Sequence, residues 1–233
     1  DMNRQTLILT PTRELAIQIQ EELKKLAKGF RFHSVTCVGG VNIRPQIRQL
    51  RMQNQFIIGT PGRVMDLIKR GDIDNSNTTT VVLDEADRML DMGFMRDIKR
   101  ILPLLPKIRH NLFFSATMPK EIQTLAGTIL SDPKKVEVTP ESTTVKLIKQ
   151  SVMYVEKPDK QHLLIHLLKD NKDNKTLIFV GMKHVADRIT KKLVKAGITS
   201  SAIHGNKSQG ARQRAIQDFA DGTVRVLVAT DIA

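Results

Sequence analysis

Short apolar runs alternate along the first 130 residues with segments whose apolar side chains recur every three or four positions. The apolar runs predict strands at 7–10, 35–38, 56–58, 81–83 and 112–114. The helical spacing predicts amphipathic helices at 15–26, 60–68 and 122–129. Strands this apolar are expected to be covered on both faces, and their alternation with helices predicts a parallel, doubly wound α/β sheet.

The same alternation restarts after a polar stretch with a proline at 139–144. Beyond it the pattern predicts strands at 151–155, 177–180, 202–203 and 226–228, and helices at 163–168, 185–193 and 211–219. A polar break of this kind is typical of a linker between domains. We therefore predict a first α/β domain at 1–139, a linker at 140–146 and a second α/β domain at 147–233.

The charge balance indicates a polyanionic partner. The chain carries 37 Lys and Arg against 24 Asp and Glu, a formal net charge of +13, and both predicted domains share the excess. Nucleic acid is the natural partner for such a surface, and plain solubility is the alternative. There is no Trp and only one Tyr, and most Phe residues stand in apolar runs. This composition favours contacts with a phosphate backbone over stacking on bases.

The overall composition is that of a soluble globular protein, with 40% hydrophobic and 26% charged residues. A single cysteine, Cys37, excludes a disulfide framework and fits a reducing, cytoplasmic compartment. No apolar run is long enough to span a bilayer, so we expect no interaction with a membrane.

Carboxylates follow one of the predicted strands. In an open parallel sheet, ligands bind beyond the carboxyl ends of the strands. Asp84 and Glu85 stand directly after the run at 81–83, which is the arrangement of a Walker-B strand. There an Asp holds Mg²⁺ on a nucleotide, and a neighbouring Glu orients or deprotonates the attacking water. The alternative is an acidic first helical turn, which the helix dipole favours.

Two strand-to-helix corners of the first domain have features of phosphate sites. Thr60, Pro61 and Arg63 combine a helix N-cap, a proline at the first helical position and a cation, which suits a phosphate at a helix N-terminus. The segment 11–14 repeats this construction after the first strand. Helix capping alone is the alternative for both corners. The hydroxyls of 115–117 either bridge to the acidic segment or cap the helix that follows them.

Polar residues also follow the strands of the second domain. His204 and Gly205 come after one strand, Gln209 and Arg212 lie one helical turn apart, and Thr230 follows the last strand. Each of these signals is weak when it is taken alone. A lone histidine, in particular, is more often structural or on the surface than catalytic.

Taken together, these segments resemble the DEAD-box ATP-dependent RNA helicase family. The motifs that carry the resemblance are PTRELA at 11–16, GG at 39–40, TPGR at 60–63, DEAD at 84–87, SAT at 115–117, LIF at 177–179, QGAR at 209–212 and ATD at 229–231. They span nearly the whole chain in the order and spacing of the family. The stretch from 202 to 231 is most similar to the bacterial RhlE-type members.

The resemblance implies two tandem RecA-like parallel-sheet domains, both truncated, that close on ATP and single-stranded RNA. It implies that Asp84, with Glu85 beside it, holds Mg²⁺ through water. Glu85 and Asp84 are then the catalytic pair, with Glu85 acting on the hydrolytic water. Asp87, Ser115 and Thr117 are implied to couple the ATP state to domain closure.

The resemblance also implies a set of contacts with the RNA backbone that do not depend on base sequence. The residues implied are Arg13, Gly39, Gly40, Thr60 and Arg63 in the first domain and Gly205, Arg212 and Thr230 in the second. Unwinding would follow from bending one RNA strand, a strain that duplex geometry cannot accept, rather than from translocation.

One family motif has no counterpart in the sequence. The chain contains no G-x-x-x-x-G-K-[ST] segment, and GNKS at 205–208 lacks the glycine directly before the lysine. The resemblance implies a P-loop before Asp1 and an arginine-finger motif after Ala233. We therefore expect a fragment that neither hydrolyses ATP nor unwinds RNA on its own.

Two other functions are compatible with the same features. One is an ATP-independent nucleic-acid-binding clamp, and the other is a DNA-directed helicase with the same core. The adjacent Asp84 and Glu85 argue against a pure clamp, because a clamp needs no Mg²⁺ site. Stimulation of ATP hydrolysis by RNA or by DNA would separate the two helicases.

Overall fold

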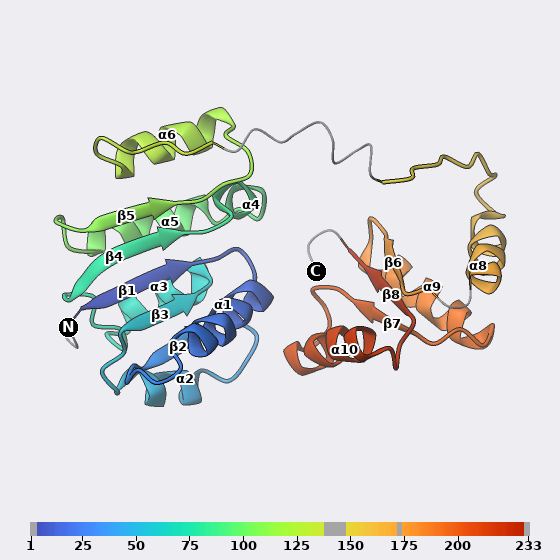
Figure 1. The fold of residues 1–233 in the computed structure, drawn as a ribbon, viewed down its shortest axis with the longest axis horizontal. Helices are drawn as coiled ribbons and strands as arrows, with labels where there is room; N and C mark the ends of the chain where they lie inside the picture. The colour runs from blue at the N-terminus through green and yellow to red at the C-terminus, as the bar shows by residue number, and fades with distance from the viewer. Residues whose placement is uncertain (1–3, 138–147, 172–173, 231–233) are drawn as a thin grey trace. The chain divides into compact units, whose positions relative to one another are not determined.

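The computed structural model describes residues 4–137, 148–171 and 174–230, and it divides into two compact units, Asp1–Pro133 and Lys134–Ala233. Each unit is built on its own parallel sheet (Figure 1). The predicted α/β class with parallel sheets is therefore confirmed. The linker predicted at 140–146 lies outside the described residues.

The first unit contains a five-stranded parallel sheet. Its strands are β1 (Gln5–Leu9), β2 (Ser34–Cys37), β3 (Phe56–Gly59), β4 (Thr78–Leu83) and β5 (His110–Phe113). They lie in the order β2-β3-β1-β4-β5, which puts the first strand of the sequence at the centre (Figure 1). The chain therefore passes from β1 to the edge strand β2, returns through β3 and then continues to β4 and β5 on the other side of β1, so that strands lie on both sides of β1 as in a doubly wound sheet.

Helices pack on both faces of this sheet. They are α1 (Arg13–Leu26), α2 (Ile43–Leu50), α3 (Pro61–Lys69), α4 (Ala86–Asp91), α5 (Met95–Ile101) and α6 (Lys120–Ile129), with a short 3-10 helix, η1, at Leu102–Leu104. On one face, Leu7 and Leu83 pack with buried residues of α3, α5 and α6. On the other, Ile8 and Ile58 pack against Ala16 of α1. Alternate residues of each strand thus reach opposite cores.

Gly59 ends β3 at a point where three elements meet. A β-carbon at this position would lie 2.3 Å from the Cys37 carbonyl oxygen and 2.8 Å from Val64 Cγ2. Because a backbone carbonyl cannot rotate away, any side chain at Gly59 would push β2 away from β3. The absence of a side chain lets β2, β3 and the start of α3 pack at this distance.

The second unit contains a three-stranded parallel sheet among the described residues. Its strands β6 (Thr176–Phe179), β7 (Ser200–Ile203) and β8 (Val226–Ala229) lie in the order β6-β8-β7. Its helices are α8 (Lys160–Asp170), α9 (Lys183–Lys195) and α10 (Gln209–Asp221). Apolar residues of α8 and α9 pack on one face of the sheet, and those of α10 pack against β7 and β8 on the other.

One expectation about the second unit is wrong. Residues 151–155 form no strand, and the side chains of Val152 and Tyr154 are 80% and 97% exposed. No described strand pairs with this segment, so its apolar residues have nothing to pack against. The strand β6 is covered on one face only, with Leu177 and Phe179 46% and 66% exposed, because α10 covers only the two other strands.

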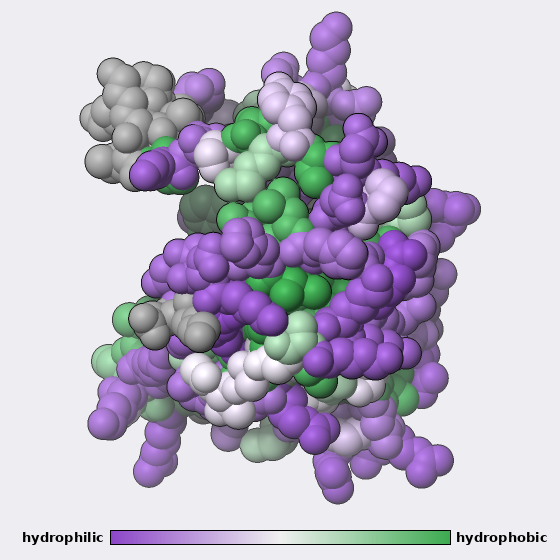
Figure 2. All heavy atoms as spheres, turned by 90° about the vertical axis from the view of Figure 1, so that its right-hand side faces the viewer, coloured by the Kyte–Doolittle hydropathy of each residue, from purple (hydrophilic) through white to green (hydrophobic). Residues whose placement is uncertain are grey.

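The surface is rich in polar side chains, as a formal net charge of +13 and 26% charged residues require. The face drawn in Figure 2 is largely hydrophilic, with hydrophobic atoms visible between the hydrophilic side chains. Scattered apolar atoms of this kind are normal on a protein surface. They do not by themselves identify a binding site.

Gly59→Ala should destabilise the first unit. We expect a loss of about 1–3 kcal/mol in the free energy of unfolding, because the new methyl group overlaps a backbone oxygen that cannot move without separating two strands. Gly127→Ala is the matched control, since a β-carbon added at Gly127 on α6 would have nothing within 4 Å, and it should stabilise by about 0.5–1 kcal/mol. Urea unfolding of both variants measures the difference, and equal stability of the two would contradict the packing described.

Candidate functional site

The parallel register of the first sheet aligns the carboxyl ends of its strands. Leu9 pairs with both Gly59 and Leu83, Gly59 pairs with Cys37, and Leu83 pairs with Phe113. The residues that follow each strand therefore line a single edge of the sheet. This is the edge at which ligands bind in open α/β sheets.

Asp84 and Glu85 lie on this edge, directly after β4. The Asp84 amide donates to the Leu9 carbonyl oxygen at 3.0 Å, and Asp84 Oδ1 accepts from the Glu85 amide at 3.0 Å. Both side chains are partly exposed, and Glu85 Oε2 lies 3.8 Å from Arg88 Nη1. The acidic pair is therefore accessible from solvent, and Glu85 forms an ion pair with Arg88 one helical turn later.

The backbone of Glu85 adopts the left-handed conformation, with φ 50° and ψ 53°. Such a conformation costs a residue with a side chain about 1–3 kcal/mol. Hydrogen bonds on either side hold it in place: the Ala86 amide donates to the Phe114 carbonyl oxygen at 3.0 Å, and the Met89 amide donates to the Glu85 carbonyl oxygen at 3.0 Å. The chain thus turns sharply from β4 into α4 at the second acidic residue.

Asp87 is tied to the segment that follows β5. Its carboxylate Oδ2 accepts from the Thr117 hydroxyl at 2.7 Å and from the Thr117 amide at 2.8 Å. The Asp87 amide donates to Ser115 Oγ at 3.1 Å, and that hydroxyl donates to the Thr117 carbonyl oxygen at 2.7 Å. The structure therefore brings Asp87, Ser115 and Thr117 together in one hydrogen-bonded cluster.

The cluster favours the charged form of the Asp87 carboxyl group. Burial raises the pKa of Asp87, but hydrogen bonds from Thr117, Ser115 and the Arg88 amide outweigh it and hold the pKa below the ordinary 3.8. A carboxylate that accepts several hydrogen bonds is stabilised in this way. Asp87 is therefore ionised at neutral pH and forms a fixed anchor for the 115–117 segment.

Basic side chains and glycines meet at the other end of the same edge. The Arg13 guanidinium lies over Gly40, where a β-carbon would be only 2.0 Å from Arg13 Nη1. Gly40 also has a φ of +71°, so its conformation and its contact with Arg13 both require glycine. Gly39 lies alongside, where a β-carbon would be 3.8 Å from Arg13 Nη2.

Arg63 approaches the same loop from α3. Its Nη2 donates to the Val41 carbonyl oxygen at 3.3 Å, while its buried Nη1 has no hydrogen-bond partner in the part of the chain that the structure describes. Burial raises the pKa of the nearby Cys37 thiol to about 12. The positive charge of the Arg63 guanidinium lowers that pKa by a smaller amount. A buried guanidinium N–H without an acceptor is costly, and a phosphate oxygen is a suitable acceptor for it.

Thr60 occupies the N-cap position of α3 and Pro61 its first helical position. The side chain of Thr60 is only 8% exposed and makes no capping hydrogen bond, so the expectation that it caps the helix is wrong for the hydroxyl. The Thr60 backbone is held at the end of β2, because its amide donates to the Cys37 carbonyl oxygen at 3.1 Å. At the first corner, in contrast, Thr12 does cap α1 by accepting from the Leu15 amide at 3.2 Å.

In the second unit, Gly205, Arg212 and Thr230 all follow the carboxyl ends of strands. Phe179 pairs with Ala229 and Ala229 with Ile203, so these ends are also aligned. The Thr230 amide donates to the Ile203 carbonyl oxygen at 3.4 Å. Arg212 and Thr230 are both 6% exposed. Asp231, the last residue of the ATD motif, lies outside the described residues.

The turn after β7 contains contacts that the sequence pattern did not predict. His204 lies beside Asp187 of α9, and Lys207 also reaches Asp187. The partners are seventeen and twenty residues apart in the sequence, so no local spacing could have identified them. His204 is thus part of a cluster rather than a lone surface histidine.

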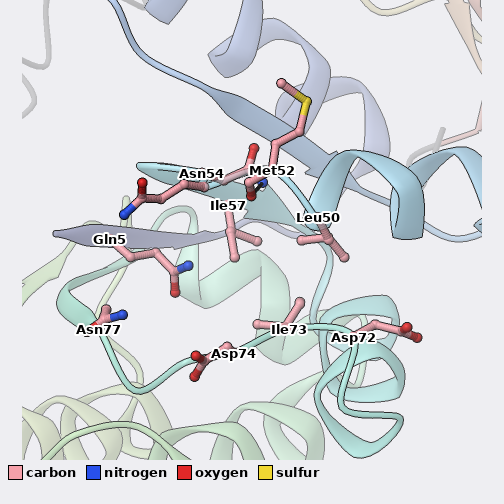
Figure 3. Close-up of a pocket in the computed structure, with 10 residues that line it drawn as sticks. Gln5, Leu50, Met52, Asn54, Ile57, Asp72, Ile73, Asp74 and Asn77 are labelled. Carbon is pink, nitrogen blue, oxygen red and sulfur yellow. Dashed lines mark hydrogen bonds between the residues drawn. The ribbon is translucent and has the colours of Figure 1, made fainter. Parts of the chain in front are cut away.

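A small pocket lies at the opposite end of the first sheet. It encloses about 140 Å³ and is lined partly by Gln5, Asn54 and Asn77, which stand at or just before the amino ends of β1, β3 and β4. Figure 3 shows these amide side chains around Ile57 and Ile73. A five-residue strand is about 16 Å long, so this pocket is remote from Asp84 and is not the candidate site.

The site suits a Mg²⁺ ion that is shared with a nucleotide. Among the residues that the structure describes, no group of three or more His, Cys, Asp or Glu side chains gathers to hold a metal. Mg²⁺ on a nucleotide needs only one or two carboxylates, because water and phosphate oxygens supply its other ligands. The accessible carboxylate of Asp84 fits that requirement. Within the same described residues, no helix is long and apolar enough to cross a membrane.

Two family models match the chain. A DEAD/DEAH box helicase model matches residues 1–125, and a helicase conserved C-terminal domain model matches residues 159–233. The first match alone covers more than half of the chain. The chain belongs to the DEAD/DEAH box helicase family.

Curated relatives agree with this assignment over nearly the whole chain. ATP-dependent RNA helicase DBP2 of Gibberella zeae is 43% identical over 231 residues, which are 97% of this chain and 42% of the relative. RNA helicase CrhR of Synechocystis sp. is 42% identical over 230 residues, covering 98% of this chain and 47% of the relative. DEAD-box ATP-dependent RNA helicase CshA of Geobacillus kaustophilus is 40% identical, with coverages of 98% and 49%. The chain spans about half the length of these relatives.

Solved structures of the family have the same fold. S. cerevisiae Dbp5 bound to RNA and ADP BeF3 matches with a TM-score of 0.86 at 31% identity, covering 98% of this chain and 58% of that one. A DEAD box protein from Methanococcus jannaschii matches with a TM-score of 0.57 at 37% identity, with coverages of 98% and 61%. The parallel sheets are therefore RecA-like, as the resemblance implied.

Asp87→Asn should destabilise the first unit in a pH-dependent way. At pH 7 we expect a loss of about 1–2 kcal/mol, because a neutral amide oxygen accepts from the two Thr117 donors more weakly than the charged Oδ2 does. The folded pKa of Asp87 is depressed, so its stabilising contribution is present above the unfolded pKa of about 3.9 and is lost as the pH falls through the lower folded pKa. Urea unfolding between pH 7 and pH 3 should show the difference from wild type shrinking in that window.

Asp91→Asn is the matched control, because Asp91 ends the same helix on the exposed surface. It should change the free energy of unfolding by less than about 0.5 kcal/mol. A loss in Asp87→Asn that is equal at pH 7 and pH 3 would contradict an ionised anchor.

Proposed function

We propose that these residues form the core of an ATP-dependent RNA helicase. In the full-length protein, RNA-stimulated ATP hydrolysis would be coupled to RNA binding and to local unwinding of duplexes. The observation that carries the proposal is the common edge of the first sheet, which bears the acidic pair Asp84 and Glu85 together with Arg13 and Arg63. Names of the relatives, all RNA helicases, support it.

For catalysis, we assign Asp84 to the binding of Mg²⁺ through water and Glu85 to the attacking water. Mg²⁺ bound with ATP would neutralise the charge that develops on the phosphates. Glu85 would accept a hydrogen bond from the water and take its proton as the water oxygen bonds to the terminal phosphorus, while the bond from that phosphorus to the bridging oxygen breaks and ADP leaves. The fixed left-handed backbone at Glu85 supports this role, because it fixes the direction in which the Glu85 side chain leaves the backbone beside Asp84.

For coupling, we assign Asp87, Ser115 and Thr117 to the link between nucleotide state and domain closure. The support is their hydrogen-bonded cluster, which joins the first turn of α4 to the segment after β5. A movement of Glu85 or Asp84 on nucleotide binding would be passed through Asp87 to Ser115 and Thr117 by these three hydrogen bonds.

For RNA, we assign backbone contacts to both units. In the first they come from Arg13, Gly39, Gly40, Thr60 and Arg63, and in the second from Gly205, Arg212 and Thr230. Support comes from the buried Nη1 of Arg63, which has no acceptor among the described residues, and from Gly40, whose lack of a side chain lets the Arg13 guanidinium lie against the loop. Phosphate contacts of this kind give affinity without sequence preference.

The sequence also predicts domain bounds, a cellular location and a subgroup. We assign residues 1–139 to the helicase ATP-binding domain and 147–233 to the C-terminal domain, joined by a linker at 140–146. We also propose a cytoplasmic location, from the single cysteine. An RhlE-type subgroup stays a prediction, since the relatives described above carry the names DBP2, CrhR and CshA.

Glu85→Gln in the full-length protein should abolish most ATP turnover. The amide keeps the size of the side chain and some hydrogen bonding but cannot accept a proton, so we expect a loss of at least about 100-fold in kcat. ATP-dependent RNA binding should be kept or tightened, because hydrolysis no longer releases the strand. Glu121→Gln, at the exposed start of α6, is the matched control.

The same assay separates the alternatives. Turnover in Glu85→Gln close to that of wild type would remove Glu85 from the mechanism. Turnover stimulated by DNA but not by RNA would indicate a DNA-directed helicase. RNA binding with no ATP turnover in the wild-type protein would indicate a clamp.

Arg63→Ala and Arg212→Ala should each weaken RNA binding to a similar extent for every RNA sequence. A lost phosphate contact should also reduce the slope of log affinity against log salt by about 0.7 for single strands. Titrations of homopolymeric and mixed oligonucleotides at several salt concentrations measure both effects. Arg100→Ala, on the exposed end of α5, removes the same charge away from the proposed surface and should leave the slope nearly unchanged. A sequence-selective loss would indicate base reading instead.

A further inference from the structure

The turn between β7 and α10 contains a buried histidine whose Nδ1 accepts a hydrogen bond and whose Nε2 faces Asp187 at ion-pair distance without hydrogen-bond geometry. His204 is 2% exposed. Its Nδ1 accepts from the Asn206 amide at 3.3 Å, and its Nε2 lies 3.2 Å from Asp187 Oδ2. Because Nδ1 accepts an N–H, the neutral ring carries its proton on Nε2, facing the carboxylate. The ring thus connects the turn to α9.

Two further contacts attach the same turn to α9. Lys207 Nζ lies 2.8 Å from Asp187 Oδ1, and Lys183 Nζ donates to Asn206 Oδ1 at 3.0 Å. The hydrogen bond from Lys207 lowers the pKa of Asp187, burial opposes it, and His204 lowers the pKa further. Asp187 is therefore a carboxylate at neutral pH, with one oxygen toward His204 and the other toward Lys207.

The turn held in this way contains Gly205, and the helix that follows it carries Arg212. Gly205 lies beside Lys183, whose Nζ would be 3.5 Å from a β-carbon on the glycine. Ser208 caps α10 by accepting from the Ala211 amide at 3.3 Å, so the helix begins directly after the turn. A displacement of the turn would therefore move both Gly205 and the first turn of α10.

We propose that Asp187 and His204 are positioning residues that hold the Gly205 turn, and with it Arg212, in the geometry that binds the RNA backbone. The inference rests on the proposed function, which assigns RNA contacts to Gly205 and Arg212. A histidine needed only for packing would be replaceable by an apolar side chain of similar size. A positioning histidine needs its acceptor at Nδ1, because that atom holds the Asn206 amide.

Substitutions that keep or remove the acceptor at Nδ1 distinguish these two roles of His204. His204→Leu keeps the volume but has no acceptor, whereas His204→Asn has an oxygen that can accept from the amide two residues on, as in an Asx-turn. Asp187→Asn keeps the shape of the carboxylate without its charge. His166→Leu is the matched control, because His166 is an exposed histidine paired with Asp170 on α8.

The measurement is the Kd of the full-length protein for a labelled single-stranded oligouridylate with a non-hydrolysable ATP analogue. We expect His204→Leu to bind about tenfold more weakly and Asp187→Asn about threefold more weakly, as for the loss of a buried or charged hydrogen bond. His204→Asn should recover affinity to within about threefold of wild type, and His166→Leu should bind as wild type does. Thermal unfolding monitored by circular dichroism accompanies each variant.

Arg212→Ala separates the two proposals. If Arg212→Ala binds weakly while His204→Leu and Asp187→Asn bind as wild type, the positioning role is overturned and the RNA surface stands. If Arg212→Ala binds as wild type, the proposed RNA surface fails and the positioning role fails with it. If His204→Leu does not fold, Asp187→Asn decides, since unchanged RNA affinity in that folded variant would overturn the proposal.

Discussion

Parallel strand register is the constraint on which the candidate sites depend. Leu9, Cys37, Gly59, Leu83 and Phe113 end their strands at one level of the first sheet. The register alone therefore brings residues from distant parts of the sequence to a single edge, without a separate long-range contact for each of them. Close packing at Gly59 maintains this alignment, because β2 and β3 can approach there only in the absence of a side chain.

At this edge, short segments rather than whole elements determine the geometry of the site. The left-handed backbone at Glu85 is unfavourable by itself, and the hydrogen bonds of Asp84, Ala86 and Met89 with their neighbours offset that cost. Asp87 then ties α4 to the segment after β5 through Thr117. The strained residue and the hydrogen bonds that offset its cost lie within a few residues of each other. The acidic pair therefore stays accessible while its backbone stays fixed.

Much of the fold and the location of the candidate site could be predicted from the sequence. Apolar runs identify buried strands whatever their partners are, and a parallel sheet places the polar residues after those runs on one edge. Motif order then identified the acidic pair, Arg13 and Arg63. The short helix α2 could not be predicted in this way, because Pro45 interrupts an already brief apolar stripe, and Leu26 fits a helical stripe although it is 81% exposed. A segment such as 151–155 has the right composition for a strand, but only a neighbouring strand can make it one.

Contacts between segments that are distant in sequence could not be predicted in this way. These contacts have a common physical form in the two units. In each, a turn after a strand carries glycine and is held by a polar side chain: the Arg13 guanidinium lies over Gly40, and His204 accepts from the Asn206 amide beside Gly205. Glycine lets a ligand approach the backbone but also leaves the turn free to move. A polar side chain that holds the turn removes that freedom, and it comes from α1 in the first unit and from the turn itself in the second. Rigid turns of this kind are what a surface needs in order to bind a regular phosphate backbone while ignoring its bases.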